Sequence, residues 1–187
     1  MTELKVSFTL RERDVEHLRW LMRRVGSDAA KLDESKVVDA VDDMVRRIRA
    51  TQVPDYVLER AGKLEELVQM VRDPEWDMPP DVRERVVGAL AYFAKPNDLI
   101  PDGVPGLGFL DDAIMIELVA RDLSHELAGY AAFRRTRQTA SVKIRGHVAS
   151  DEPSLELDER LATERQRQRA RIQEREAKAR SGRRLLW

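Results

Sequence analysis

The fold is decided by the stretch Asn97-Asp98-Leu99-Ile100-Pro101-Asp102-Gly103-Val104-Pro105-Gly106-Leu107-Gly108-Phe109-Leu110-Asp111-Asp112, which separates two segments of strong helical periodicity. Its three glycines, two prolines and four aspartates favour turns over a continuous helix. Loops of this length are uncommon within compact domains, and they are usually functional or disordered. Apolar side chains recur along this one, so we predict an ordered loop that buries Ile100, Leu107, Phe109 and Leu110.

Helical periodicity extends on both sides of the loop. Before it, the pattern predicts helices over about 11–25, 33–48, 54–71 and 80–94. Asp33 is a candidate N-cap, and Pro54 and Pro80 suit a first helical turn. After the loop, the sequence predicts one long helix over about 111–135 and a charged helix over about 155–180. Trp20 and Trp76 are expected to pack in the core.

Two short segments, 4–10 and 141–148, alternate apolar and polar residues with the period of a strand. A single strand is marginal in water, so the two segments are expected to pair within the chain or across a dimer.

The predicted fold class is therefore all-α or nearly so: a soluble multi-helix domain with a minor two-strand element and a projecting basic C-terminal helix. We divide the chain into an N-terminal strand and helices (1–79), a helix-loop-helix core (80–136), a linker or strand (137–154) and a basic helix and tail (155–187). No internal repeat is visible.

The composition excludes several classes of protein and site. A hydrophobic share of 42% is too high for general disorder. The absence of cysteine excludes a disulfide framework and a thiolate metal site. The N-terminus lacks the apolar core of a secretion signal, and no uncharged apolar run approaches the roughly 20 residues of a spanning helix. A cytoplasmic, soluble protein is expected.

The net charge of −1 hides an asymmetry between the two parts of the chain. Residues 160–187 contain ten Arg or Lys and three acidic residues, a charge of +7, so that residues 1–159 carry about −8. The body is acidic and the tail is basic, and we expect the two to attract each other.

The residues around the loop resemble the YkvA-like family, domain of unknown function 1232, over about residues 82–133. The resemblance rests on Tyr92-Phe93, on the run Pro96-Asn97-Asp98-Leu99-Ile100-Pro101-Asp102, and on Pro105, Gly108 and Leu110-Asp111-Asp112. It implies a helical domain in which this loop joins two helices. It implies no established catalytic residue.

Two interpretations of the loop aspartates remain open. Asp98, Asp102, Asp111 and Asp112 provide hard oxygen ligands that a rigid loop could bring together on a divalent cation, and a hydrolase is one activity that such a site could support. Alternatively they are structural: Asp98 and Asp102 suit turns, Asp111 suits the N-cap of the following helix, and Asp112 suits its first turn. We favour the structural interpretation and predict no cofactor.

Two segments are candidates for binding a partner. The basic tail presents an alternating arginine run and an apolar end, and it could contact protein, RNA or an anionic membrane; its candidate residues are Arg165, Arg167, Arg169, Arg171, Arg183, Arg184, Leu185, Leu186 and Trp187. The N-terminal segment loosely resembles a ribbon-helix-helix DNA-binding motif, although the connection between its helices is longer than in that motif.

We therefore predict a non-enzymatic interaction or scaffold protein. It is expected to be a homo-oligomer, with residues 4–10 or the C-terminal helix at the interface. The alternatives are a divalent-metal-binding domain built on the loop and a nucleic-acid-binding protein. The pathway and the partner cannot be read from the sequence.

Overall fold

The structure is a computed structural model that describes residues 9–29, 33–94, 104, 107–145 and 153–184. Seven helices and no strand occur in these residues, which confirms the all-α fold class. The helices are α1 (Glu12–Ala29), α2 (Glu34–Ala50), α3 (Asp55–Arg72), α4 (Pro80–Leu90), α5 (Leu110–Asp122), α6 (Ser124–Arg145) and α7 (Pro153–Arg184).

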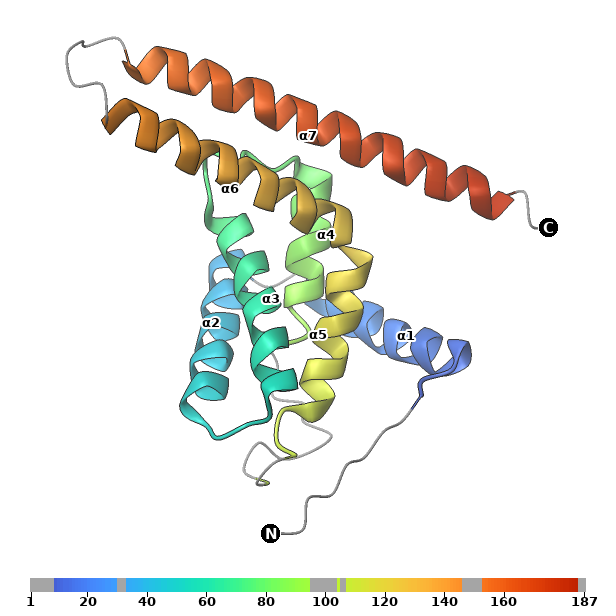
Figure 1. The fold of residues 1–187 in the computed structure, drawn as a ribbon. Coiled ribbons are helices and arrows are strands. Elements are labelled where there is room, and N and C mark those ends of the chain that lie inside the picture. The colour runs from blue at the N-terminus through green and yellow to red at the C-terminus, as the bar shows by residue number, and fades with distance from the viewer. Residues whose placement is uncertain (1–8, 30–32, 95–103, 105–106, 146–152, 185–187) are drawn as a thin grey trace.

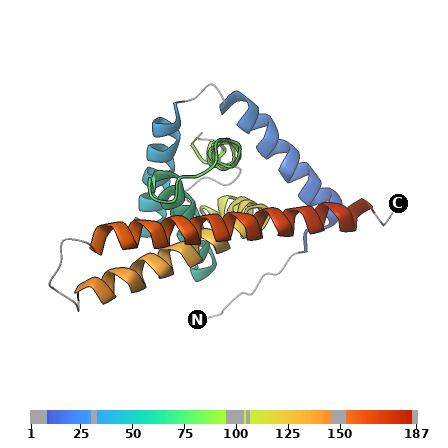
Figure 2. The same ribbon diagram turned by 90° about the horizontal axis from the view of Figure 1, so that it is seen from above.

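α2, α3, α4 and α5 form an upright bundle, with α1 at its side and α6 and α7 across one end (Figure 1). α3 packs against α2, α4 and α5, and α4 also contacts α2. α1 leans against the bundle and contacts α4 and α5. α6 and α7 form an antiparallel hairpin that lies across one end of the bundle, and the C-terminal end of α7 extends beyond it (Figures 1 and 2). The start of α5 lies at the opposite end of the bundle (Figure 1).

The bundle core consists of aliphatic side chains at helical spacing, because each helix turns one apolar face inward. Three of the most deeply buried are Leu64, Leu90 and Ile116, each with no exposed surface. α5 is buried on several sides, and six of its thirteen residues are buried. Residues of 1–79 and of 80–136 contribute to this same core.

Local signals place the helix starts. Asp33 caps α2 by accepting a hydrogen bond from the backbone N–H of Ser35 (3.0 Å), as predicted. Pro80 is the first residue of α4, where its fixed φ suits the helix and no N–H is needed. Pro54 occupies the N-cap position of α3, one residue before the helix.

The strand prediction at 141–148 is wrong for residues 141–145, which continue α6. The alternation of Val142 and Ile144 with charged residues spans too few residues to oppose a helix that is already formed, because extending a helix costs far less than starting one. Residues 146–148 and most of the 4–10 segment lie outside the described residues.

The predicted helix over 111–135 is instead two helices that meet at Leu123. This residue has φ −103° and ψ 20°, and it is buried. Hydrogen bonds from Leu123 N–H to Val119 and from Leu127 N–H to Leu123 cross the junction. The irregularity therefore turns the chain from the bundle into the hairpin without separating α5 from α6.

The loop predictions are partly confirmed. Phe109 is buried, with 2% of its surface exposed, but Leu107 is 51% exposed, so the prediction is wrong for Leu107. Leu110 is partly buried, and Ile100 lies outside the described residues. Trp76 is buried as expected, whereas Trp20 is 46% exposed on α1.

Candidate interaction site on the α6–α7 hairpin

α7 docks on the body through a narrow set of side chains. Leu161 and Gln168 are buried, and Leu157 is partly buried against the core. Ile172 lies so close to Gly129 of α6 that a Cβ added there would be 2.9 Å from the Ile172 Cδ1 atom. A side chain at position 129 would therefore require the end of the Ile172 side chain to move.

The connection between α3 and α4 (residues 73–79, here the α3–α4 linker) is the platform on which the hairpin rests. Trp76 of this linker is 3% exposed, and its ring packs against Tyr130 and Phe133 of α6, with centroid distances of 5.7 and 5.3 Å. Asp73 accepts hydrogen bonds from the Tyr130 hydroxyl and from Arg137 Nη1, both at 3.0 Å. Burial, together with the bond to Asp73, raises the pKa of Tyr130 to about 12.

Two arginines of α7 bind backbone carbonyls of the α3–α4 linker. Arg165 Nη1 donates to the Glu75 carbonyl at 2.7 Å. One turn later, Arg169 Nη2 donates to the Trp76 carbonyl at 3.4 Å and to the Asp77 carbonyl. Asp77 has φ 47°, a left-handed conformation that aspartate tolerates better than most residues. These bonds fix the rotation of α7 about its axis.

An ion-pair bridge adds a second attachment. Arg85 of α4 pairs with Glu126 of α6, whose side chain is 3% exposed. The Nη1 atom of Arg85 also lies 3.1 Å from Glu176 of α7. A buried carboxylate needs such a partner, because an unpaired buried charge is costly. The bridge joins α4, α6 and α7 at one arginine.

The docking of α7 leaves a row of cations on its exposed side, which we call the outer stripe: Arg160, Arg167, Arg171, Arg175 and Lys178. All five are exposed. At 100° per residue they fall within about 80° of the helix circumference, and they extend over about 27 Å of its length. Glu164 falls within the same arc and Glu174 lies just outside it, and Glu174 pairs with Lys178 at 2.7 Å. No hydrogen bond or ion pair to Arg167 or Arg171 is found within the described residues.

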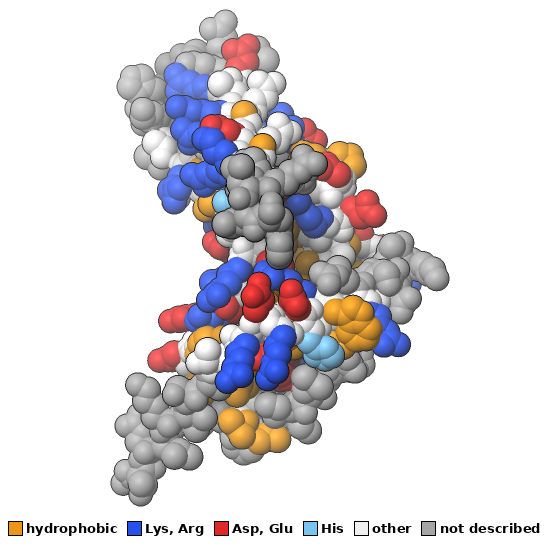
Figure 3. Space-filling view, turned by 90° about the vertical axis from the view of Figure 1, so that its right-hand side faces the viewer, with side chains coloured by type: hydrophobic (Ala, Val, Ile, Leu, Met, Phe, Trp, Pro, Cys, Tyr) orange, Lys and Arg blue, Asp and Glu red, His pale blue; other side chains and the backbone are white. Residues whose placement is uncertain are grey.

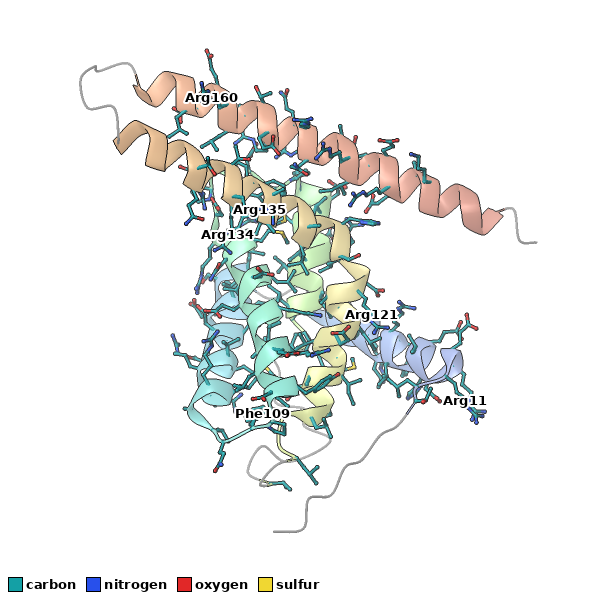
Figure 4. All side chains as sticks on the ribbon, viewed as in Figure 1. Arg11, Phe109, Arg121, Arg134, Arg135 and Arg160 are labelled. Atoms are coloured by element: carbon teal, nitrogen blue, oxygen red, sulfur yellow. The ribbon has the colours of Figure 1, made fainter. Side chains whose placement is uncertain are left out.

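The hairpin is the basic end of the molecule. Lys and Arg side chains gather along one side of its upper part, where α6 and α7 lie (Figure 3). Arg134 and Arg135 of α6 and Arg160 of α7 lie on the two helices of the hairpin (Figure 4). Arg135 is exposed, and Arg134 Nη1 donates to Gln69 of α3 at 3.0 Å.

The structure thus divides the arginine run that the sequence singled out. Arg165 and Arg169 face the body, whereas Arg167 and Arg171 face solvent. Arg183 and Arg184 belong to the last turn of α7, but their side chains lie outside the described set, as do residues 185–187. The hypothesis that Leu185, Leu186 and Trp187 form an apolar latch stays a prediction.

The aspartates of the loop are only partly described. Asp98 and Asp102 lie outside the described residues, while Asp111 and Asp112 occupy the first turn of α5. Within the part of the chain that the structure describes, no group of three acidic or histidine side chains is placed to hold a metal ion. Metal binding by all four aspartates stays a prediction.

The prediction that Asp111 caps this helix is wrong, because the helix begins one residue earlier. Phe109 occupies the N-cap position with φ 63°, and its side chain makes no cap hydrogen bond. A bulky residue with positive φ is a strained conformation. Burial of the Phe109 ring at the end of the bundle away from the hairpin offsets that strain (Figure 4).

A cleft of about 410 Å³ lies between the start of α2, the end of α3 and the α3–α4 linker. Its main charged groups pair with one another: Arg83 with Glu34, and Arg72 with Asp39. Asp73 and Asp77 also line the cleft, and they pair with Arg137 of α6 and Arg169 of α7.

Sequence reasoning missed Arg85, Glu126, Glu176 and the α3–α4 linker as parts of the docking site. The only signal was the pair of proline-containing segments, Asp73-Pro74 and Met78-Pro79-Pro80, which marked a break without indicating that a helix would dock there.

Comparison with known proteins identifies the segment from α4 to α5. Residues 85–118 match the family model described as Protein of unknown function (DUF1232). We call these residues the DUF1232 segment. A curated relative, the uncharacterized membrane protein YkvA of Bacillus subtilis (strain 168), is 36% identical over 72 residues. That match spans 35% of this chain and 66% of the relative's length.

The DUF1232 segment confirms the family resemblance inferred from the loop, and it leaves α7 beyond the matched residues. No solved structure matches the chain significantly. Among the described helices, none combines the length and the apolar character that crossing a bilayer requires.

Proposed function

We propose that this protein is a non-enzymatic interaction protein that binds an anionic partner along the outer stripe of α7. The observation that carries the proposal is that α7 has a docked face and an exposed basic face. Arg165 and Arg169 hold the helix on the body, and the outer stripe is presented to solvent on a fixed support. Because α7 is held in one rotation about its axis, its exposed charges form an ordered row. Little conformational entropy is then lost when a partner binds.

The location of the positive charge also supports this function. The net charge of the chain is only −1, so general attraction to polyanions is not expected. Any polyanion that binds must do so through a local basic surface, and the hairpin provides one. The relative from Bacillus subtilis is named a membrane protein, and an anionic bilayer is one partner of this kind. Self-association stays a prediction beside this proposal.

The test is retention of the full chain on an immobilised sulfated polysaccharide, with elution by salt. The test variant is Arg167→Gln, Arg171→Gln and Arg175→Gln, because glutamine keeps helix propensity while removing charge. The matched control is Arg46→Gln, Arg47→Gln and Arg49→Gln, which removes the same charge from exposed positions on α2.

We expect the α7 variant to elute at much lower salt than the wild type, and the α2 control to elute with the wild type. Equal elution of the two variants would contradict the proposal, because retention would then follow net charge and not the stripe.

A further inference from the structure

We propose that the anionic partner is a bilayer surface rich in anionic phospholipid, against which the outer stripe lies flat. This inference rests on the proposed function and names its partner. Three observations favour a bilayer over a nucleic acid: the width of the hairpin, the side chains beside the stripe, and the straight course of the stripe.

The first observation is that α7 does not stand alone. α6 lies along it, and the two helices approach closely where Ile172 meets Gly129. The major groove of DNA is about 12 Å wide and admits one helix of about 10–12 Å diameter. A pair of helices with axes about 8–10 Å apart is too wide to enter. A planar surface sets no such limit.

The second observation is the chemistry around the stripe. α7 contains no aromatic residue from Pro153 to Arg184, and its exposed flanks are short or polar, such as Ala170, Gln173 and Ala177. Proteins that bind single strands without sequence preference use aromatic side chains on which bases stack. Bilayer binding through charge needs no aromatic side chain.

The third observation is geometric. The cations follow one line along an outermost helix that crosses the whole width of the molecule (Figure 2). A flat array of lipid phosphates can meet all of them at once. Because the exposed face lacks large apolar side chains, α7 should lie at the level of the headgroups without inserting into the acyl region. Binding should then be electrostatic and sensitive to salt.

The experiment is cosedimentation of the full chain with vesicles of phosphatidylcholine alone or of phosphatidylcholine mixed with phosphatidylglycerol. We expect binding only to the anionic vesicles, and its loss at high salt. If each cation contributes roughly fivefold, the α7 triple variant binds roughly a hundredfold more weakly. The α2 triple control should bind like the wild type. Circular dichroism checks that both variants fold. If the α7 triple variant does not fold, the single variant Arg171→Glu replaces it in the vesicle experiment.

The same proteins are then tested with a DNA duplex, a single-stranded RNA and polyglutamate. Stripe-dependent binding to any of these without binding to anionic vesicles would overturn the bilayer inference and leave the proposed function intact. Binding to none of the polyanions or vesicles would overturn both. Vesicle binding that the α7 variant retains in full would also overturn the bilayer inference.

Discussion

At the scale of single residues, Gly129 of α6 leaves room for the end of the Ile172 side chain of α7. A glycine within a helix is unfavourable relative to alanine unless something requires its small size. At Gly129 the requirement is visible, since an added Cβ would lie 2.9 Å from the Ile172 Cδ1 atom. At Gly62 of α3 and Gly88 of α4, an added Cβ meets no atom within 4 Å. The three glycines therefore differ in their role.

Replacement by alanine should separate these roles. We expect Gly62→Ala and Gly88→Ala each to raise the free energy of unfolding by about 0.5–1 kcal/mol, because alanine favours the helix. Gly129→Ala should give no such gain, since Ile172 must move to admit the methyl group. Urea denaturation measures all three. A gain at Gly129 equal to that at the other two positions would show that the contact with Ile172 is loose.

The ionisation of Glu117 of α5 depends strongly on its surroundings in the fold. Partial burial raises its pKa, but hydrogen bonds from Lys63 (2.8 Å) and Arg121 (2.9 Å) and the charge of Arg60 outweigh this effect and lower the pKa to about 2. A carboxylate whose folded pKa is lowered stabilises the protein above its unfolded pKa. This contribution is lost as the pH falls through the folded value.

We therefore expect Glu117→Gln to lower the free energy of unfolding at pH 7, by at most about 3 kcal/mol. The difference from the wild type should shrink as the pH falls from about 5 toward 2. Glu174→Gln is the control, because Glu174 is an exposed residue of α7 and should change stability little. A difference between Glu117→Gln and the wild type that stayed constant with pH would argue against the ionic role of Glu117.

At the scale of elements, α7 shows why alternating arginines need not share a face. Residues 165 and 169 are separated by one turn and point the same way, as do 167 and 171. The two pairs therefore lie on different sides of one helix, and the linker carbonyls select which pair turns inward. Docking and presentation of charge are compatible on the same helix.

Removing each pair should have different consequences. Arg165→Ala with Arg169→Ala removes the bonds to the α3–α4 linker, and we expect faster amide hydrogen exchange across α7. Arg167→Ala with Arg171→Ala removes the same charge from the exposed side, so exchange in α7 should stay close to that of the wild type. Equal exchange in the two variants would contradict the assignment of inner and outer faces.

The sequence predicted those elements whose signals are local. Asp33 and Pro80 place the starts of α2 and α4 because a cap and an N-terminal proline act within one turn. The Asp111 cap was wrong because burial of Phe109 holds that residue in the cap position. The break at Leu123 and the exposure of Trp20 depend on packing between distant segments. The inner and outer faces of α7 depend on a linker 90 residues away in sequence, as the Arg165–Glu75 bond shows.

At the scale of the whole molecule, the DUF1232 segment extends from the hairpin toward the opposite end of the bundle, since Arg85 at its start pairs with Glu126 and Glu176 of the hairpin. Phe109, just before α5, lies at one end of the bundle, and α6 and α7 lie at the other (Figures 1 and 4). Part of the +7 charge of residues 160–187 lies against the body, where Arg165 and Arg169 bind the α3–α4 linker. The outer stripe carries another part, which faces solvent.

The most direct measurement of the central claim is the protection of single probes on α7 and α2. The natural chain has no cysteine, so Arg171→Cys and Arg46→Cys each provide one labelling site at the cost of one exposed cation. With an environment-sensitive label, we predict that anionic vesicles protect position 171 from an aqueous quencher and leave position 46 accessible. Equal protection of both positions, or protection of position 46 alone, would contradict the claim that the outer stripe of α7 is the binding surface.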